Sequence, residues 1–330
     1  MAGMVIVGGG LAAEGVAKTL RRESYEGEIT VIAEEPHLLY ERPPLSKEFL
    51  AGKASADKVI LHDQAWYDEQ RITVRTGIAA TAISPAEHRV TLADGSTLDY
   101  DKLVLATGSS ARTLPIDGHD LDGVFTLRTL DDATALHDAL KAGDKNLVLI
   151  GSGWIGMEVA ASARALGNTV TVLERGRIPL ERALGAEIGR EFERVHLEHG
   201  VVFRTEAGVE AIEGAGGRVT GVRVDGEVIP ADLVLVGVGA APNTALAETA
   251  GLEVSNGIVT DASMRTSAAD VFAAGDVASS FHPVLGQHLR SEHWQNAKSS
   301  AKVAAQAMLG QAAQHDEIPY FYTDQYDLGM

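Results

Sequence analysis

The feature that most constrains this sequence is a glycine-rich motif that occurs twice, each time between an apolar run and a segment with helical spacing. Its positions are Gly8, Gly10 and Ala13 in the first copy and Gly151, Gly153 and Gly156 in the second. At such positions the missing side chains permit a tight turn, the close approach of a pyrophosphate, and contact between helix and strand. The sequence therefore predicts two β-α-β units that each bind a dinucleotide at a helix N-terminus.

A carboxylate follows each motif where the next apolar run ends: Glu34 after residues 29–33, and Glu174 after residues 170–173. A carboxylate there can accept hydrogen bonds from the adenosine ribose. At Glu174 it would also repel a 2′-phosphate, since two charges about 4 Å apart at an effective dielectric near 20 interact by roughly 4 kcal/mol. The second unit is therefore predicted to bind NAD rather than NADP, although Arg175 and Arg177 nearby oppose this reasoning.

Composition excludes several classes of protein. The 330 residues carry a formal net charge of −18, which argues against a nucleic-acid or anionic-membrane surface. Glycines interrupt every apolar run, so neither a signal peptide nor a membrane span is visible, and we expect a cytoplasmic protein. The sequence has no cysteine. Disulfides, thiolate metal sites and redox-active dithiols are thereby excluded, so any redox chemistry must use a bound cofactor.

Further motifs resemble those of a known family. They are VGGGLAAEG, YERPPLSKEFL, LVLATG, GSGWIGMEVA, VFAAGDVA and PYFYTDQYDLG. From residue 4 to 330 the sequence is similar to the FAD-dependent NADH:ferredoxin reductases of bacterial oxygenases and cytochromes P450, the putidaredoxin reductase and biphenyl dioxygenase reductase type. This group lies within the pyridine nucleotide-disulfide oxidoreductases and lacks their redox cysteines. RPPLSK and TDQYDLG are more specific signs of the group than the glycine motifs.

The resemblance implies an α/β fold of the glutathione-reductase type, with two Rossmann-like domains and the NAD domain inserted in the FAD domain. We expect the FAD domain at residues 1–113 and 241–319, and the NAD domain at 114–240. Residues 320–330 would be the start of a C-terminal interface domain whose remainder is absent from this sequence. Family members often have tryptophans where Tyr320 and Tyr322 stand, which changes the aromatic surface offered to the nicotinamide.

The resemblance also assigns roles to single residues. Lys47 and Glu158 match a pair that in the family forms an ion pair beside flavin N5, the atom that accepts hydride. Without the motif match, Glu158 is a favourable acid near a helix N-terminus and Lys47 a solvated loop cation. Asp276 matches the aspartate that accepts a hydrogen bond from a ribityl hydroxyl, and it is also a typical helix N-cap.

Other positions match cofactor contacts of the family. Ala12 and Ala80 would contact the adenosine through their backbone, Trp294 would lie near the ring, and Arg128 would serve the pyrophosphate unless it is a surface charge. The remaining expected contacts are Arg42, Thr107 and Gly108 for FAD, and Ile155 and Gly239 for NAD. We expect no metal site, and interpret His282, His288 and His293 as surface or packing residues.

The expected activity is hydride transfer from NADH to FAD, followed by transfer of single electrons to a [2Fe–2S] ferredoxin. Two alternatives stay open: a sensor of NADH like apoptosis-inducing factor, and a component that serves rubredoxin or nitrite reductase. Acidic ferredoxins usually meet basic surfaces, which an overall charge of −18 does not offer. Lys298, Lys302 and Arg290 form the candidate docking patch, unless they are ordinary charges on a solvated helix.

Overall fold

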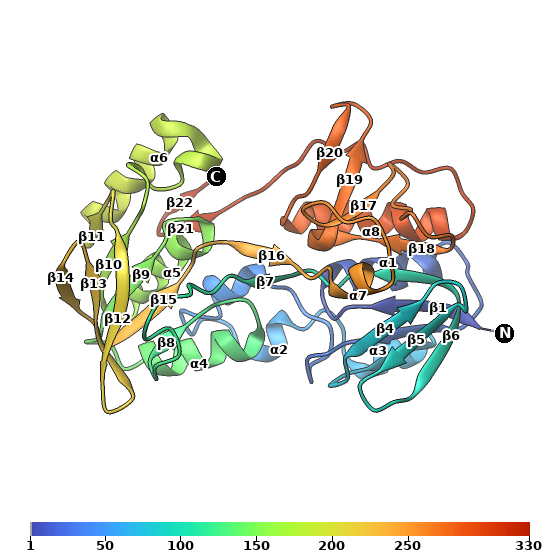
Figure 1. Ribbon diagram of the computed structural model, residues 1–330, viewed down its shortest axis with the longest axis horizontal. Helices are drawn as coiled ribbons and strands as arrows, with labels where there is room; N and C mark the ends of the chain where they lie inside the picture. Colours follow the sequence, from blue (N-terminus) through green and yellow to red (C-terminus); the bar gives the residue numbers. More distant parts are fainter. Residues whose placement is uncertain (1) are drawn as a thin grey trace. The chain divides into compact units, whose positions relative to one another are not determined.

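The computed structural model describes residues 2–330, which divide into two compact units (Figure 1). Unit 1 contains the residues up to Glu41 together with Ile60–Ser110 and Pro242–Phe321. Unit 2 contains Arg42–Val59, Ala111–Ala241 and Tyr322–Met330. The long middle part of unit 2 is therefore inserted in the sequence of unit 1. The strands β7 (Ser109–Ala111) and β16 (Ala240–Pro242) carry the chain out of and back into unit 1.

A seven-stranded sheet forms the centre of unit 1. Its order is β3-β2-β1-β6-β5-β4, with β18 also paired to β6. The strands are β1 (Gly3–Val7), β2 (Ile29–Ile32), β3 (Ile72–Arg75), β4 (Ala80–Ser84), β5 (Arg89–Leu92), β6 (Thr97–Leu105) and β18 (Val271–Ala273). β1 is parallel to both β2 and β6; β1, β2 and the last residues of β6, Leu103–Leu105, are largely buried, as expected for a sheet covered on both faces.

Two long helices of unit 1 pack against each other beside this sheet: α1 (Leu11–Arg22) and α8 (Trp294–Met308). A Cβ at Gly15 of α1 would lie 2.9 Å from the Cβ of Ala301, so the small residue permits their close contact. The other helices are α3 (Gln64–Glu69), α7 (Ala245–Thr249) and the 3₁₀ turn η2 (Gly275–Val277). A small sheet contains β17 (Ile258–Thr260), β19 (Ala278–His282) and β20 (Gln287–Leu289).

Unit 2 is built on a five-stranded parallel sheet of order β11-β10-β9-β15-β8. Its strands are β8 (Val124–Phe125), β9 (Asn146–Ile150), β10 (Thr169–Leu173), β11 (Val201–Arg204) and β15 (Leu233–Val236). An antiparallel sheet follows with β12 (Val209–Ala215), β13 (Arg218–Val224) and β14 (Glu227–Pro230). The helical segments are η1 (Pro43–Ser46), α2 (Ala56–Val59), α4 (Leu130–Leu140), α5 (Trp154–Ala165) and α6 (Glu181–Glu198), and a last hairpin joins β21 (Asp324–Gln325) to β22 (Leu328–Gly329).

Two segments that the predicted domain bounds assign to other domains belong to unit 2. Residues 42–59 fold with unit 2 because the carbonyl of Ser46 accepts the hydroxyl of Ser162, and the carbonyl of Leu50 contacts Nδ1 of His137 at 2.9 Å. The terminal hairpin also belongs to unit 2. Within residues 2–330 no helix is both long and apolar enough to cross a bilayer.

Candidate active site

The first glycine motif forms the turn between β1 and α1 in unit 1. Gly8 has φ +145°, and a Cβ there would lie 2.1 Å from the carbonyl oxygen of Ala106. Gly10 is the N-cap of α1, and a Cβ there would meet nothing within 4 Å. Ala13 is fully buried. Gly8 is thus required by the fold itself, whereas Gly10 leaves open space in front of the helix N-terminus, which suits a pyrophosphate.

The second motif repeats this arrangement between β9 and α5 in unit 2. At Gly151 a Cβ would lie 2.5 Å from the carbonyl oxygen of Gly237. At Gly156 a Cβ would lie 2.3 Å from the carbonyl oxygen of Gly151. Gly153, the N-cap of α5, again has nothing within 4 Å of a Cβ. Ile155 is 41% exposed in the first turn of α5. Both helix N-termini therefore have the open shape and the positive dipole end that a dinucleotide phosphate needs.

The two acids after the motifs differ in their surroundings. Glu34 is exposed directly after β2. Glu174 follows β10 and already accepts hydrogen bonds from the protein: its Oε2 takes the N–H and hydroxyl of Ser152, at 3.0 and 2.5 Å, and its Oε1 takes the N–H of Gly176 at 2.6 Å. Arg177 is paired with Glu206, whereas Arg175 is exposed. Glu174 thus fixes the loop of the second motif as well as presenting its carboxylate beside it.

Lys47 and Glu158 form an ion pair inside unit 2. The Lys47 ammonium lies 3.0 Å from Oε2 of Glu158, and the two side chains are only 11% and 5% exposed. Lys47 follows η1 and Glu158 lies in the second turn of α5, so the two come from segments far apart in sequence. The hydroxyl of Ser46 donates to the same Oε2 at 2.5 Å. Lys47 is therefore not a solvated loop cation, and its role in catalysis stays a prediction.

The second oxygen of Glu158 is bound by a residue that the sequence analysis gave no role. The hydroxyl of Thr323 donates to Oε1 at 2.8 Å. Thr323 is fully buried just before β21, next to Tyr322, whose ring centroid lies 5.7 Å from the Lys47 ammonium. The motif TDQYDLG indicates the family, but the sequence alone does not show which contacts its polar residues make.

Several of the expected FAD contacts gather where the chain leaves and re-enters unit 1. Thr107 donates its hydroxyl to the carbonyl of Asn243 at 2.8 Å, and the Asn243 amide donates to the carbonyl of Thr107 at 2.8 Å. The carbonyl of Gly108 accepts the N–H of Asn243. Asn243 was missed because no motif marks it. Its contacts hold the expected exit segment, Thr107 and Gly108, in a fixed conformation.

Asp276 lies inside the 3₁₀ turn η2, so the helix N-cap interpretation of this residue is wrong. Its Oδ2 accepts the hydroxyl of Ser109 at 3.3 Å. Gly275 has φ +77°, and a Cβ there would lie 2.8 Å from that of Ala12. The backbone around Asp276 is therefore close to the first motif, as a residue that serves the same cofactor requires.

The other expected FAD contacts come from both units. In unit 2, the guanidinium of Arg42 donates to the backbone carbonyl of Arg128 at 2.6 Å, and both residues are half-buried. In unit 1, Trp294 begins α8 and donates its indole N–H to Glu41 at 3.0 Å, and Ala80 begins β4. Gly239, an expected contact of NAD rather than FAD, lies in unit 2, has φ +102° and precedes β16. Their contacts with cofactors stay predictions.

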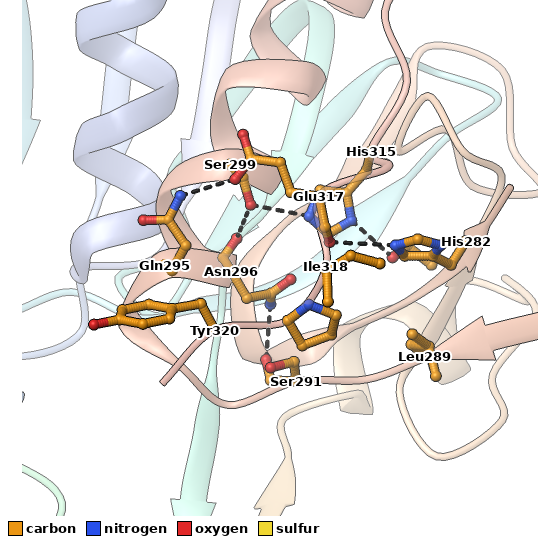
Figure 2. A pocket seen from close by; sticks show the side chains of 12 residues that line it. His282, Leu289, Ser291, Gln295, Asn296, Ser299, His315, Glu317, Ile318 and Tyr320 are labelled. Atoms are coloured by element: carbon orange, nitrogen blue, oxygen red, sulfur yellow. Dashed lines mark hydrogen bonds between the residues drawn. The ribbon is translucent and has the colours of Figure 1, made fainter. Parts of the chain in front are cut away.

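Most histidines of the C-terminal part of unit 1 lie in packed surroundings, and only His288 of those discussed is exposed. Figure 2 shows His282 and His315 lining a small pocket, in which His315 lies between two serine hydroxyls, 3.3 Å from that of Ser280 and 3.0 Å from that of Ser299. His282 is 2% exposed and contacts the carbonyl of Glu317. His293 stacks on Phe321, and burial lowers its pKa. No cluster of potential metal ligands occurs among residues 2–330.

One member of the candidate docking patch has to be removed from it. Arg290 is only 12% exposed; it pairs with Glu292 and donates to the carbonyl of Asp276. Its charge is compensated and largely buried, so the prediction that it faces a partner is wrong. Lys298 and Lys302 are exposed on α8, and the Lys298 ammonium lies 3.9 Å from the ring centroid of Trp294.

Residues 3–301 match the family model described as pyridine nucleotide-disulphide oxidoreductase. The chain belongs to this family. It is 43% identical over 330 residues to the ferredoxin–NAD(+) reductase component of an anthranilate 1,2-dioxygenase system from Burkholderia cepacia, with 99% of this chain and 80% of the relative covered.

Two solved structures of the family superpose closely on this chain. One is the ferredoxin reductase for the CYP199A2 system from Rhodopseudomonas palustris, with TM-score 0.96, 36% identity, and 99% of this chain and 81% of that one covered. The other is the covalent putidaredoxin reductase–putidaredoxin complex, with TM-score 0.96, 38% identity, and 99% and 80% covered. These matches confirm the fold class and the family predicted from the motifs.

Proposed function

We propose that this chain takes electrons from NADH through FAD and delivers them singly to a [2Fe–2S] ferredoxin that supplies an oxygenase or a cytochrome P450. FAD supplies the chemistry of this exchange, because it accepts a hydride, with its two electrons, at N5 and releases electrons one at a time. The observation that carries the proposal is the buried Lys47–Glu158 pair. It occurs in a chain with two dinucleotide motifs and no cysteine, so a thiol intermediate is excluded.

The residues of the first motif fit FAD. Gly10 leaves the N-terminus of α1 open, and Gly275 and Ala12 bring the segment of Asp276 close to it. Asp276 provides a carboxylate for a ribityl hydroxyl, and Glu34 provides one for the adenosine ribose. Arg42 and Arg128 are the cations proposed for the pyrophosphate, and Thr107, Gly108, Ala80 and Trp294 complete the proposed set of contacts.

The residues of the second motif fit NADH. Gly153 leaves the N-terminus of α5 open for the pyrophosphate, and Ile155 offers an exposed apolar side chain beside it. Glu174 provides a ribose acceptor and disfavours a 2′-phosphate. Gly239, with its positive φ, is the proposed backbone contact after the end of the neighbouring strand β15.

We propose that Lys47 and Glu158 serve the hydride transfer itself. A lysine ammonium near the flavin stabilises the negative charge that hydride transfer brings to the ring. Burial keeps water away from this ammonium and strengthens its field. Glu158 holds the ammonium in one position and compensates its charge until the transfer occurs. Neither group has to exchange a proton for this role.

The proposed electron acceptor is a ferredoxin. The anthranilate 1,2-dioxygenase relative is named a ferredoxin–NAD(+) reductase component, and one similar structure is a complex with putidaredoxin. On this chain we place the docking surface at Lys298 and Lys302, because two exposed cations one turn apart form a local positive region on an acidic protein. We also propose that the protein acts in the cytoplasm, where NADH and ferredoxins are available.

The proposal is tested by an anaerobic titration of the FAD-loaded protein with NADH, followed by addition of a [2Fe–2S] ferredoxin. We expect the flavin absorbance at about 450 nm to bleach with one equivalent of NADH, and two equivalents of ferredoxin to restore it. Failure to bleach would contradict the NADH assignment. Bleaching without transfer to the ferredoxin, accompanied by a change in molecular size, would favour an NADH sensor instead.

A further inference from the structure

A continuous chain of polar side chains lies behind Glu158 in unit 2. Thr323 contacts Oε1 of Glu158 at 2.8 Å, and the amide nitrogen of Gln325 contacts the Thr323 hydroxyl at 3.1 Å. The amide oxygen of Gln325 lies 2.7 Å from Nε2 of His196, and Nδ1 of His196 lies 3.4 Å from the hydroxyl of Tyr326. The three inner residues of the chain are 0–1% exposed.

The chemistry of these groups fixes the direction of every hydrogen bond. An ionised carboxylate only accepts, so Thr323 donates its single hydroxyl hydrogen to Glu158. The Thr323 oxygen then accepts from the amide N–H of Gln325, whose carbonyl oxygen can only accept from His196. His196 therefore carries its proton on Nε2, and its Nδ1 accepts from Tyr326. All four donors point toward Glu158.

Such a chain does not conduct protons, because an amide in the middle neither takes up nor releases one at ordinary pH. Its effect is electrostatic. Successive hydrogen bonds oriented the same way polarise one another, and the last of them stabilises the charged form of the acceptor. His196 suits this arrangement, since burial lowers its pKa to about 4 and keeps the ring neutral.

We propose that Thr323, Gln325 and His196 are positioning residues that hold the Glu158 carboxylate in one orientation, so that its other oxygen keeps Lys47 in place for hydride transfer. The inference deepens the proposed function and rests on it. It gives the terminal TDQY segment a task in the reaction: the segment supplies the hydrogen-bond donor that Oε1 of Glu158 requires.

Few other charges compete for this carboxylate. Among the elements that pack on α5, η1 is followed by Lys47, and β21 contributes Asp324, which is exposed. The strands β9 and β10 bring no titratable residue. Behind the chain stand His199, stacked on Tyr326, and Arg164, which lowers the pKa of Tyr326 less than burial raises it. The position of the Glu158 carboxylate is therefore governed by Lys47, Ser46 and Thr323.

The inference is tested with Thr323→Val, which keeps the shape of the side chain and removes its donor. We measure the rate of flavin bleaching by NADH as a function of pH, and the midpoint potential of the bound flavin as a function of pH. In the variant the rate is expected to fall about tenfold across the pH range and the midpoint potential to become more negative, because Glu158 loses the hydrogen bond that orients it and Lys47 is held less firmly. Thr323→Ser restores the donor and is expected to restore both profiles.

A matched control is Thr260→Val in unit 1, since the hydroxyl of Thr260 is buried without a hydrogen-bond partner among the described residues. It is expected to leave both profiles unchanged. If Thr323→Val does not fold, Gln325→Met removes the next donor and is expected to lower the rate about threefold.

Unchanged profiles in folded Thr323→Val, or an equal change in Thr260→Val, would overturn the inference. Neither readout requires a ferredoxin. A wild-type protein that bleaches with NADH yet reduces no ferredoxin would therefore contradict the proposed function while still allowing this test.

Discussion

The Thr323 hydroxyl and the Glu158 carboxylate form a buried hydrogen bond of 2.8 Å across 165 residues of sequence. Glu158 thereby has both oxygens occupied, one by Thr323 and the other by Ser46 and Lys47. A buried carboxylate with three partners has little freedom to reorient, and the lysine that it holds is equally restricted. The Lys47–Glu158 pair is therefore held in one arrangement.

Removing either charge of the pair is expected to slow flavin reduction strongly. In Glu158→Gln the lysine loses its counterion, and in Lys47→Met the positive charge itself is lost. We expect each change to lower the rate of bleaching by NADH about 10–100-fold, measured by stopped-flow absorbance. The double variant should be about as slow as either single one, because the two residues act together. Rates that fell by the product of the two single effects would argue that they act independently. Arg177→Gln, which breaks an exposed pair with Glu206, is the control.

Substitutions at Gly10 and Gly153 can show whether these positions serve cofactor binding rather than stability. Gly10 and Gly153 have φ −107° and −73°, which alanine adopts, and a Cβ at either would meet no protein atom. We expect Gly10→Ala to weaken FAD retention and Gly153→Ala to raise the Kd for NADH at least about tenfold, while the free energy of unfolding without cofactor changes by less than about 1 kcal/mol.

Gly151→Ala is the contrasting variant, since its Cβ would lie 2.5 Å from a carbonyl oxygen at a positive φ. It is expected to lower stability by several kcal/mol, roughly the cost of strain and overpacking together. Urea unfolding of the three variants gives the comparison. Equal losses of stability in all of them would mean that the open space at Gly10 and Gly153 is not a ligand site.

Cofactor preference is expected to depend on Glu174. Replacing it with serine removes the charge that opposes a 2′-phosphate and leaves Arg175 exposed beside it. We expect the ratio of kcat/KM for NADH to that for NADPH to fall about 10–100-fold. Part of the loss with NADH will come from the loop, because Ser152 and Gly176 lose their acceptor. Glu206→Gln, which releases Arg177 and keeps Glu174, should change the ratio much less; an equal change would contradict the assignment to Glu174.

Acid should destabilise the protein through His196. Its pKa of about 4 in the folded protein lies below the ordinary value of 6.5, so the unfolded chain binds the proton more tightly. The stabilisation from the neutral ring is complete above about pH 6.5 and is lost as the pH falls toward about 4. The His196→Phe variant is expected to have a lower free energy of unfolding near neutrality. Between about pH 7 and pH 5 that free energy should fall by about 2 kcal/mol less than in the unchanged protein. Parallel pH profiles of the two proteins in urea unfolding would refute this.

The docking proposal is best tested at Lys302. Lys298 lies over the ring of Trp294, so changing it also disturbs the packing at the start of α8. Lys302→Glu is expected to raise the KM for a ferredoxin severalfold at low salt and to reduce its dependence on ionic strength, while bleaching by NADH alone stays normal. Arg290→Gln should affect cofactor retention or stability rather than the KM for the ferredoxin, because its guanidinium faces Glu292 and Asp276.

The fold and the two dinucleotide units could be predicted because the chemistry behind them is local. Gly8 and Gly151 sit at positive φ beside a carbonyl, a requirement visible in a stretch of a few residues. The partnership of Lys47 with Glu158 required the family motif, since nothing within either segment indicates that they meet. Thr323 and Asn243 were missed because each acts through a contact with a distant segment, and neither residue type is unusual at its position.

Arg290 shows the opposite error. An arginine followed by two exposed lysines indicates a basic surface when only the sequence is considered. In the structure its guanidinium is turned inward, to Glu292 and to the backbone of Asp276. Charge patterns along a sequence report which residues can form a patch, and only the fold decides which of them face solvent.

The hydrogen bonds between Thr107 and Asn243 have a consequence for the history of the chain. These residues stand 136 positions apart, yet the backbone leaves and rejoins unit 1 at neighbouring points. The entropic cost of closing a loop grows only with the logarithm of its length. Unit 1 can therefore tolerate inserted domains of different sizes at this junction. Recombination can therefore exchange the nucleotide specificity of such a reductase as a single module, provided that the incoming domain also supplies the partners of residues 42–59.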